Sequence, residues 1–407
     1  MIKEKNVVSI LDIGSTKITC IIVKKIYVDN FEVLGISQTV SKGIKSGVIV
    51  DLDLAKASII KSIEAAEKIA LTAVKNVFIS LNSSFLISER SLADVMMSNQ
   101  EVTVKDLNKM LFKVLGKFNT QEVTIVHTFP YEYILDGNRG IIHPLGLYGH
   151  KLTGFFHIIS VPLHYIVTIS KYLEMCQLKI EGYICGGYAA GIACLKNEDM
   201  EFGCALIEIG GGSSTISLFC NGKVIFTDGV PYGGINITRD IAKVFNLEMK
   251  IAEKIKTTYG AIMKVGDQSN SQTINIENNN KNDDKIFVDP HDLNEVIIAR
   301  MREMLTLLKD KLEDNDMMEL VNKIVYTGGS SQFIGIQNLV EDVFQVKSRI
   351  GSPNINAQIS DKFLRTGFAV PIGMLKCIND MSYHKKHLLA NKKGILKSVW
   401  IWLKENF

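Results

Sequence analysis

One short pattern occurs twice in this chain, almost half a chain length apart, and it limits the possible folds more than any other feature. In each copy an apolar strand ends in an acidic residue, followed by isoleucine, a turn of glycine and hydroxyl residues, and a second β-rich strand. The acidic residues are Asp12 and Glu208. The spacing far exceeds the periods of about 20–50 residues that mark solenoids. The pattern therefore predicts an α/β protein with two similar lobes facing a cleft.

Both turns are suited to bind phosphate. Glycine lets backbone N–H groups approach an anion closely, and hydroxyl groups add further donors. Lys17 adds a positive charge, and Asp12 and Glu208 would hold Mg²⁺ through water, because Mg²⁺ keeps most of its waters. Either turn alone is also typical of an ordinary hairpin, but the pair indicates a nucleoside triphosphate site. The candidate phosphate-binding residues are Gly14, Ser15, Thr16 and Lys17 in the first turn and Gly210, Gly211, Gly212 and Ser213 in the second.

A third glycine-rich turn follows the strand-like segment 323–326. It contains Gly328, Gly329 and Ser330, and we expect it to open a helix over 333–343. The N-terminus of a helix that begins with glycines can lie against an α-phosphate and the adenosine. A Gly-Gly pair also caps ordinary loops between strands and helices. Its position after the other two turns favours a nucleotide cleft.

Residues 84–160 differ from the sequence on either side. Strand-like pieces alternate there with one helix near 104–115, which predicts a small α+β insert. Residues 266–285 are polar and low in complexity, so we expect an exposed, mobile loop. The predicted division is lobe I in 1–83, 161–200 and 346–380; the insert in 84–160; lobe II in 201–345, with helices at about 235–312; a flexible linker in 381–393; and an amphipathic helix in 394–407.

Composition excludes several classes of protein. The 46 Lys and Arg nearly balance the 43 Asp and Glu, so we expect no nucleic acid partner. The apolar stretches are shorter than the roughly 20 residues that span a bilayer, and we find no signal peptide. The seven cysteines form no CxxC pair, which predicts free thiols in the cytoplasm. The spacing of the four histidines in the insert suits no compact metal site, and we expect structural or surface roles for them.

The segment 394–407 has the pattern of an amphipathic helix behind a polar stretch. Both tryptophans of the chain lie in it, and lysines occupy the opposite face. An interfacial helix places tryptophan at the headgroup boundary and lysine toward anionic lipid. A helix that docks on the protein's own core or on a partner is the alternative, and the polar stretch disfavours the first of these. The candidate membrane-binding residues are Leu396, Val399, Trp400, Trp402, Leu403 and Phe407.

The three turns together resemble those of the actin, hexokinase and heat-shock-chaperone ATPase superfamily. Residues 12–17 are similar to its phosphate-1 motif, 208–213 to its phosphate-2 motif and 326–331 to its adenosine motif. Within the superfamily the chain resembles the FtsA family of bacterial cell-division proteins over nearly its whole length. The further segments that carry this resemblance are Pro231–Ala242, Ala252–Gly260, Gly149–Leu152 and Arg349–Gly351.

This resemblance implies an actin-like ATPase fold: two duplicated lobes around a nucleotide cleft, with one actin subdomain missing and the insert placed elsewhere. It implies ATP and Mg²⁺ as ligands, and helices at about 235–312 that contact the nucleotide. By family analogy, Glu253 and Lys256 reach the ribose and base, and Gly234 lies close to the phosphates. The plainer interpretation of Glu253 and Lys256 is a solvated ion pair on a helix.

The resemblance also implies a place in the cell. FtsA proteins polymerise into actin-like filaments, attach the FtsZ ring to the inner membrane and recruit later division proteins. The expected partners are therefore the FtsZ C-terminal tail, further copies of this chain, anionic lipids and, through the insert, later division proteins. The expected location is the cytoplasmic face of the bacterial inner membrane, at the division site. Arg300 and Arg302 are candidate contacts for the acidic FtsZ tail, although a solvated basic face is the plainer interpretation.

Two departures from the superfamily pattern affect the expected chemistry. Glu208 stands where the superfamily has Asp, and its extra methylene shifts the carboxylate that faces Mg²⁺. Segment 185–190 contains glycines where hydrolysing relatives carry a Glu or Gln that orients the attacking water. Such a group typically contributes about 10²–10⁴-fold to the rate. We therefore expect tight nucleotide binding with slow or negligible hydrolysis.

Three other classes share the ATPase fold. A small-molecule kinase would need a catalytic acid in a substrate pocket and has no use for a terminal Trp-rich helix. A chaperone-like ATPase would need a peptide-binding domain for which the chain has no room. A shape-determining actin relative would lack the insert. The kinase remains the alternative function.

Overall fold

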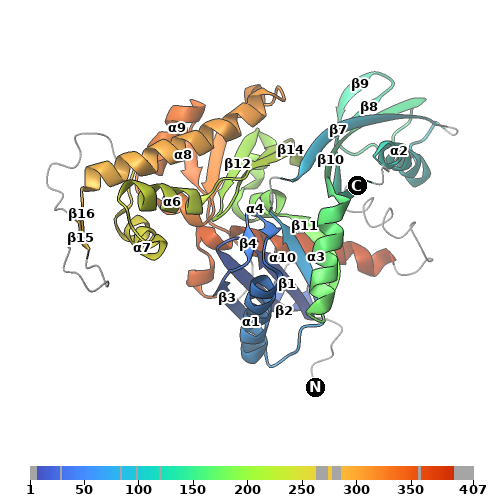
Figure 1. The fold of residues 1–407 in the computed structure, drawn as a ribbon. Helices are drawn as coiled ribbons and strands as arrows, with labels where there is room; N and C mark the ends of the chain where they lie inside the picture. The colour runs from blue at the N-terminus through green and yellow to red at the C-terminus, as the bar shows by residue number, and fades with distance from the viewer. Residues whose placement is uncertain are drawn as a thin grey trace.

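The computed structural model describes residues 7–27, 30–82, 85–97, 100–118, 122–262, 274–276, 286–355 and 359–388. Two five-stranded sheets form the centres of two lobes, and a separate four-stranded sheet forms the insert (Figure 1). Both predicted lobes and the predicted insert are therefore present. None of the helices in the described part of the chain is both long and apolar enough to span a membrane.

The two lobe sheets have the same strand order and the same strand directions. In each, a hairpin strand pairs antiparallel with the next strand on one side and parallel with a later strand on the other. The strands of lobe I lie in the order β3 (Asn30–Val40), β2 (Lys17–Tyr27), β1 (Val7–Ile13), β6 (Asn76–Leu81) and β11 (Lys179–Cys185); those of lobe II in the order β14 (Lys223–Val230), β13 (Ser214–Cys220), β12 (Cys204–Ile209), β17 (Lys323–Thr327) and β18 (Ser348–Ile350).

Helices cover both faces of both sheets, because the strands alternate apolar side chains between two faces. Leu11 and Cys20 pack with the outer helices of lobe I, whereas Ile10 and Ile21 pack with two central helices. Leu206 of lobe II joins the same central cluster. The central helices therefore lie between the two sheets. The outer helices are α1 (Leu52–Ala70) and α3 (Leu163–Met175) in lobe I and α6 (Gly234–Val244), α7 (Met249–Tyr259), α8 (Pro290–Glu313) and α9 (Ile336–Phe344) in lobe II; the central ones are α4 (Gly186–Cys194) and α10 (Ala369–Leu388).

Small residues let the two central helices approach each other and the sheets. A Cβ on Gly373 of α10 would lie 1.8 Å from the carbonyl oxygen of Ala189 in α4. A Cβ on Gly191 would lie 2.2 Å from the ring of Phe219. Side chains at these positions are excluded by backbone and by an aromatic ring, which explains the composition of the small-residue helix predicted at 187–195.

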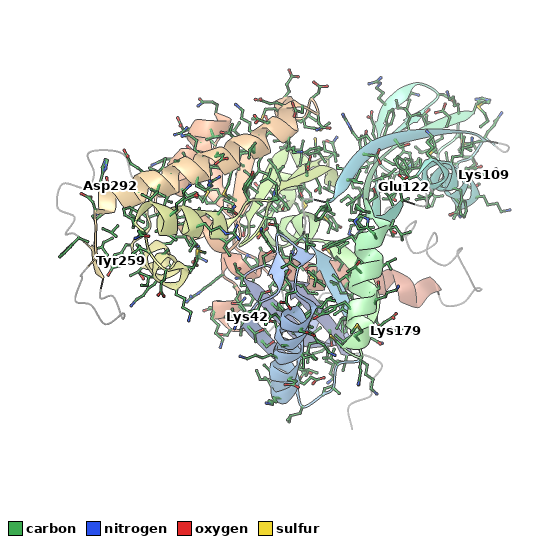
Figure 2. All side chains as sticks on the ribbon, viewed as in Figure 1. Lys42, Lys109, Glu122, Lys179, Tyr259 and Asp292 are labelled. Carbon is green, nitrogen blue, oxygen red and sulfur yellow. The ribbon has the colours of Figure 1, made fainter. Side chains whose placement is uncertain are left out.

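The insert is a sheet with one helix packed against it. Its strand order is β7-β10-β8-β9, and the helix α2 closes an apolar core that includes Met110 and Phe156. Its elements are β7 (Ile87–Met96), α2 (Val104–Lys117), β8 (Val123–Leu135), β9 (Asn138–Ile141) and β10 (Lys151–Pro162). Figure 2 marks the three parts with Lys109 and Glu122 on the insert, Lys42 and Lys179 on lobe I, and Tyr259 and Asp292 on lobe II.

Two histidines, the buried His157 and the half-buried His127, attach the insert to the lobes. His157 Nδ1 lies 3.2 Å from the carbonyl oxygen of Val224 in lobe II, and its Nε2 lies 2.8 Å from Ser88 Oγ. His127 Nε2 accepts a hydrogen bond of 3.0 Å from the backbone N–H of Cys185 in lobe I. Burial lowers the pKa of His127 to about 4 and that of His157 to about 3. Both rings are therefore neutral near pH 7 and serve structural roles, as expected.

Some boundaries differ from the sequence prediction. Helix α10 continues to Leu388, so the segment 381–393 predicted as a flexible linker begins inside a helix. Strand β15 (Ile274–Ile276) pairs with β16 (Ile286–Val288), within and just after the segment predicted as a polar loop. The predicted terminal helix, 394–407, lies outside the described residues. Shorter elements are β4 (Ile44–Lys45), β5 (Val48–Ile49), α5 (Asn197–Glu201) and the 3₁₀ helices η2 (Met318–Leu320), η3 (Gly329–Gln332), η4 (Asp361–Phe363) and η5 (Thr366–Phe368).

Candidate functional site: a cleft between two matched turns

The two repeated turns have the same internal hydrogen bond. In the first, the N–H of Gly14 donates to the carbonyl of Lys17 at 3.0 Å, and in the second the N–H of Gly210 donates to the carbonyl of Ser213 at 3.0 Å. Asp12 and Glu208 precede these turns, and each pairs across its hairpin with a threonine. The repeat read from the sequence is therefore also a repeat of backbone geometry.

The two turns lie against each other across the cleft. A Cβ on Gly211 would lie 2.2 Å from Thr16 Oγ1, and one on Gly212 would lie 2.4 Å from Ser15 Oγ. Any larger residue at these two positions would fill the space between the lobes. Glycine keeps backbone N–H groups open to this space, and this is the arrangement that cradles phosphate. The turns thus fit the polyphosphate predicted for them.

The third turn packs directly onto the second. Gly328 has φ +99°, and a Cβ there would lie 2.4 Å from the carbonyl oxygen of Ile209. Ser330 Oγ donates to the carbonyl of Gly210 at 3.2 Å. The glycine pair does not open a long helix as predicted. Gly329 starts the short helix η3, and α9 begins only at Ile336, because Gly335 at φ +83° separates the two elements.

A cavity of about 340 Å³ joins the three turns. Its walls include all the predicted phosphate-binding residues and both acids. Gly328 is the one predicted nucleotide contact that does not line it, because its role is to pack under the second turn. The lining residues that sequence reasoning did not select are Ile13, Asn82, Ile235, Thr257, Gly260, Gln332, Phe333, Thr366, Gly367 and Val370.

Three charged groups lie at one end of the cavity, where Asp12 is buried and Glu208 and Lys17 are half-buried. Burial, and next the Asp12 carboxylate, raise the pKa of Glu208 to about 8. Burial also raises the pKa of Asp12 and lowers the pKa of Lys17, and the attraction between Lys17 and the carboxylates opposes both shifts. Two carboxylates beside one lysine leave an excess of negative charge when both are ionised, which a divalent cation would balance. Among the described residues no three His, Cys, Asp or Glu side chains gather as a set that could hold a metal ion.

Asp12 is held by two residues from one segment: Ser80 lies in strand β6, and Asn82 follows directly after it. Ser80 Oγ donates to Asp12 Oδ1 at 2.6 Å, and Asn82 Nδ2 donates to the same oxygen at 2.8 Å. Ser80 Oγ also accepts from the N–H of Ile13 at 3.3 Å. These contacts orient the carboxylate toward the cavity. Sequence reasoning missed both residues because nothing local marks them.

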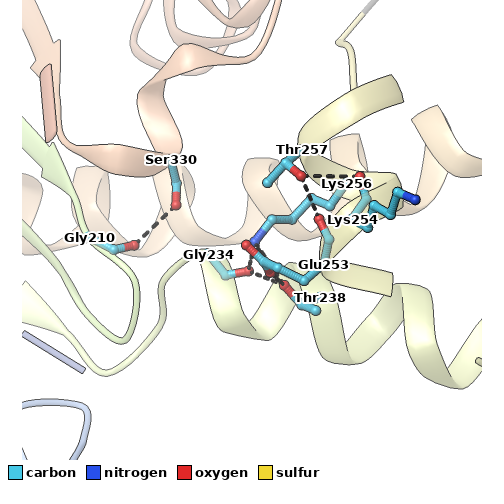
Figure 3. A network of polar contacts seen from close by, with 8 residues as sticks. All are labelled: Gly210, Gly234, Thr238, Glu253, Lys254, Lys256, Thr257 and Ser330. Carbon is cyan, nitrogen blue, oxygen red and sulfur yellow. Dashed lines mark hydrogen bonds and ion pairs between the residues drawn. The ribbon is translucent and has the colours of Figure 1, made fainter. Parts of the chain in front are cut away.

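Lys256 and Glu253 line the cavity, but they also bind each other (Figure 3). Lys256 Nζ donates to Gly234 O at 3.0 Å, to Thr238 Oγ1 at 2.8 Å and to Glu253 Oε2 at 2.7 Å. Gly234 in turn is the first residue of α6, and its N–H donates to the carbonyl of Gly210 at 2.9 Å. The lysine therefore ties α7 to the start of α6 beneath the second turn. Its ammonium makes three internal hydrogen bonds before any nucleotide contact.

The two arginines predicted as partner contacts lie outside the cavity. Arg300 Nε donates to Asp240 Oδ2 at 2.5 Å, and Arg302 Nη1 donates to Asp342 Oδ2 at 2.6 Å. The Asp240 hydrogen bond raises the pKa of Arg300. Both side chains are engaged within lobe II, so a partner that binds them has to compete with these ion pairs.

Comparisons with known proteins agree with this geometry. A family model described as "Cell division protein FtsA" matches residues 205–373, and a model of the SHS2 domain inserted in FtsA matches residues 83–160. The cell division protein FtsA of Agrobacterium fabrum is 32% identical over 100% of this chain and 96% of its own length. The chain belongs to the FtsA family of cell division proteins. The FtsA of Borreliella burgdorferi is 27% identical over 98% of this chain and 100% of its own length.

Solved structures show the fold of this FtsA-family chain. A chain of the PilM-PilN type IV pilus biogenesis complex superposes with a TM-score of 0.64 at 16% identity, covering 91% of this chain and 98% of its own. MreB 5 of Spiroplasma citri bound to AMPPNP superposes with a TM-score of 0.54 at 15% identity, covering 95% and 99%. The predicted actin-like ATPase fold with an inserted subdomain is confirmed.

Proposed function

We propose that this FtsA-family chain binds ATP with Mg²⁺, polymerises on the inner face of the bacterial membrane and tethers the FtsZ ring there. The observation that carries the nucleotide part is the pair of matched turns. They bring their backbone N–H groups, two acids and Lys17 to one cavity between the lobes. A site with this donor set suits a polyphosphate and a divalent cation.

Each group in the cavity has a separate task in this proposal. The N–H groups and hydroxyls of both turns donate to phosphate oxygens, and Lys17 adds charge. No ion pair within 4.0 Å is formed by Lys17 among the described residues, and its Nζ lies 5.6 Å from the ring centroid of Phe368, a contact that leaves its N–H groups able to turn toward phosphate. Asp12 and Glu208 hold Mg²⁺ through water, and Mg²⁺ when bound neutralises phosphate charge. The side chains near Lys256 and Glu253 lie at the other end, where the ribose and base bind.

The proposal includes slow or negligible hydrolysis. The start of α4 is Gly186-Gly187, so this helix contributes no acid or amide side chain to the cavity. Without a water-orienting side chain on this helix, we expect a loss of about 10²–10⁴-fold in rate. Nucleotide then acts as a structural ligand that holds the two lobes together.

The cellular part of the proposal rests on family membership and on the terminal segment. Residues 396–407 have the amphipathic pattern of a peripheral membrane helix. One short helix gives weak, reversible attachment, and polymerisation strengthens it because many helices then bind together. We propose that lobe II binds the FtsZ C-terminal tail and that the insert recruits later division proteins.

Co-sedimentation with vesicles tests the tether. The full chain and a truncation ending at Asn391 are mixed with Mg²⁺-ATP, anionic vesicles and the FtsZ C-terminal peptide, with neutral vesicles as the lipid control. We expect only the full chain to sediment with anionic vesicles and to bring the peptide with it. If both proteins stay in the supernatant and ATP is turned over rapidly on a small substrate, the tether is excluded and the small-molecule kinase takes its place.

A further inference from the structure

Asn82 projects a side chain into the cavity beside the start of helix α4, whose first two residues are glycines without side chains. Asn82 follows β6 and lines the cavity beside Asp12. Its Nδ2 donates to Asp12 Oδ1 at 2.8 Å and to Ser80 Oγ at 3.2 Å. A carboxylate accepts hydrogen bonds, so the amide nitrogen faces Asp12 and the amide oxygen faces the other way. The amide is therefore held at the end of the cavity that contains the acids.

The amide oxygen of Asn82 lies against the start of α4. A Cβ on Gly186 would lie 1.4 Å from Asn82 Oδ1, so a side chain at position 186 and this amide exclude each other. The next residue packs in the opposite direction. A Cβ on Gly187 would lie 2.5 Å from Ser217 Oγ in β13 of lobe II. The first turn of α4 is thus held between Asn82 of lobe I and β13 of lobe II.

The same turn of α4 is attached to the insert. The N–H of Cys185, directly before α4, donates to His127 of β8, and the ring of Tyr188 lies 4.7 Å from the ring of Phe129, centroid to centroid. The first turn of α4 therefore contacts lobe I, lobe II and the insert. A displacement of the Asn82 amide would move this turn. Packed interiors transmit such displacements because they contain few voids.

We propose that Asn82 distinguishes a nucleoside triphosphate from a diphosphate in this cleft and passes the difference to α4. This inference rests on the proposed nucleotide function. The turn N–H groups and Lys17 serve any phosphate, whereas Asn82 lies beside Asp12, at the end where Mg²⁺ and the terminal phosphate belong. Its contribution should therefore appear mainly when the terminal phosphate is present. In this proposal the terminal phosphate takes over the hydrogen bond that Asn82 Nδ2 otherwise donates to Ser80. A hydrogen bond to a charged group typically corresponds to about tenfold or more in affinity.

Calorimetric titration with AMPPNP and with ADP, each with Mg²⁺, measures this discrimination. Three full-length variants are compared with the original chain. Asn82→Ala removes the amide, Gly186→Ala pushes it aside, and Asn76→Ala is the matched control. Asn76 lies at the other, exposed end of β6. Among the described residues, its side chain forms a hydrogen bond with Glu181.

We expect Asn82→Ala and Gly186→Ala each to reduce the preference for AMPPNP over ADP about tenfold, and Asn76→Ala to leave it unchanged. A further variant that combines Asn82→Ala and Gly186→Ala should lose no more AMPPNP preference than Asn82→Ala alone, because both single changes act on one contact. Hydrogen exchange gives a second readout. The amides of residues 186–189 should differ between AMPPNP and ADP in the original chain and become alike in Asn82→Ala.

The outcomes separate this inference from the proposed function. An unchanged AMPPNP preference in Asn82→Ala, with intact binding of both nucleotides, overturns the role of Asn82 and leaves the nucleotide site standing. Failure of the original chain to bind either nucleotide overturns both. If Asn82→Ala does not fold, Asn82→Ser keeps a small polar side chain at this position and is read in the same way.

Discussion

The attachment of the insert through the buried His157 should make the stability of the protein depend on pH in a defined direction. The pKa of His157 is about 3 in the folded chain, against an ordinary value of 6.5, because burial disfavours the charged ring. The unfolded chain therefore binds the proton more readily. The stability that neutral His157 confers is complete above about pH 6.5 and is lost as pH falls from there toward pH 3.

The size of this effect follows from the two pKa values. A pH of 5 lies about 1.5 units below the ordinary histidine pKa of 6.5, and each unit corresponds to about 1.4 kcal/mol. The free energy of unfolding at pH 5 should therefore be lower than at pH 7 by about 2 kcal/mol through His157 alone. Protonation would also place a charge near Arg90 and His127, which lower the pKa of His157 further. Glu208 titrates with the opposite sign, since its pKa is raised, and His127 with the same sign, since its pKa is lowered to about 4, so the total pH dependence combines the three groups.

A comparison with a variant isolates His157. Asn at this position keeps a donor for the carbonyl of Val224 and does not titrate. Urea unfolding followed by far-ultraviolet circular dichroism at pH 7 and pH 5 gives the stability of each protein. We expect the original chain to be the more stable at pH 7 and its advantage over His157→Asn to shrink by about 2 kcal/mol at pH 5. Glu208 is common to both proteins and cancels.

The exposed His143 of the same insert provides the matched control. His143→Asn should follow the original chain at both pH values. An advantage over His157→Asn that stays constant between pH 7 and pH 5 would refute the assignment of a neutral, buried ring, and with it the reasoning on the attachment of the insert to lobe II.

Three further changes test other parts of the structure. Lys17→Ala should weaken Mg²⁺-ATP binding about tenfold to a hundredfold in calorimetric titration, and unchanged affinity would contradict its phosphate role. Lys256→Met leaves three acceptors without their donor and should cost about 3 kcal/mol in urea unfolding, whereas Lys254→Met on the same helix should cost little. Gly373→Ala should destabilise by about 1–3 kcal/mol, because its Cβ meets backbone, and Gly116→Ala, with open space around it, should not.

The turns could be predicted from sequence because their evidence is local. An acid at a strand end and a few glycine and hydroxyl residues suffice to identify the turn after Asp12 and its copy after Glu208. The partners of Asp12 could not be found in this way. Ser80 lies 68 residues further along the chain and reaches Asp12 only because β6 pairs parallel with β1. Such a contact depends on the sheet order, which no local pattern encodes.

Other residues were identified but given too simple a role. Family analogy places Lys256 at the nucleotide, and the structure shows that its ammonium also ties α7 to α6 through Gly234. Gly328 was grouped with the nucleotide contacts, yet it is needed because only a residue that accepts a positive φ fits under the second turn. In both cases the residue type is informative. What the residue contacts, however, depends on packing between elements that are distant in sequence.

The matching strand orders of the two lobes have a consequence for how such a cleft arises. Two identical units joined side by side would place their turns around a two-fold axis, and each turn would present the same groups to a ligand. Fusion into one chain lets the halves diverge. Here the first turn carries Lys17 where the second carries Ser213, and Asp12 corresponds to Glu208. The two-fold symmetry is therefore lost at the two turns, where the lobes meet. A ligand with two unlike ends, such as a nucleotide, then has a single preferred orientation.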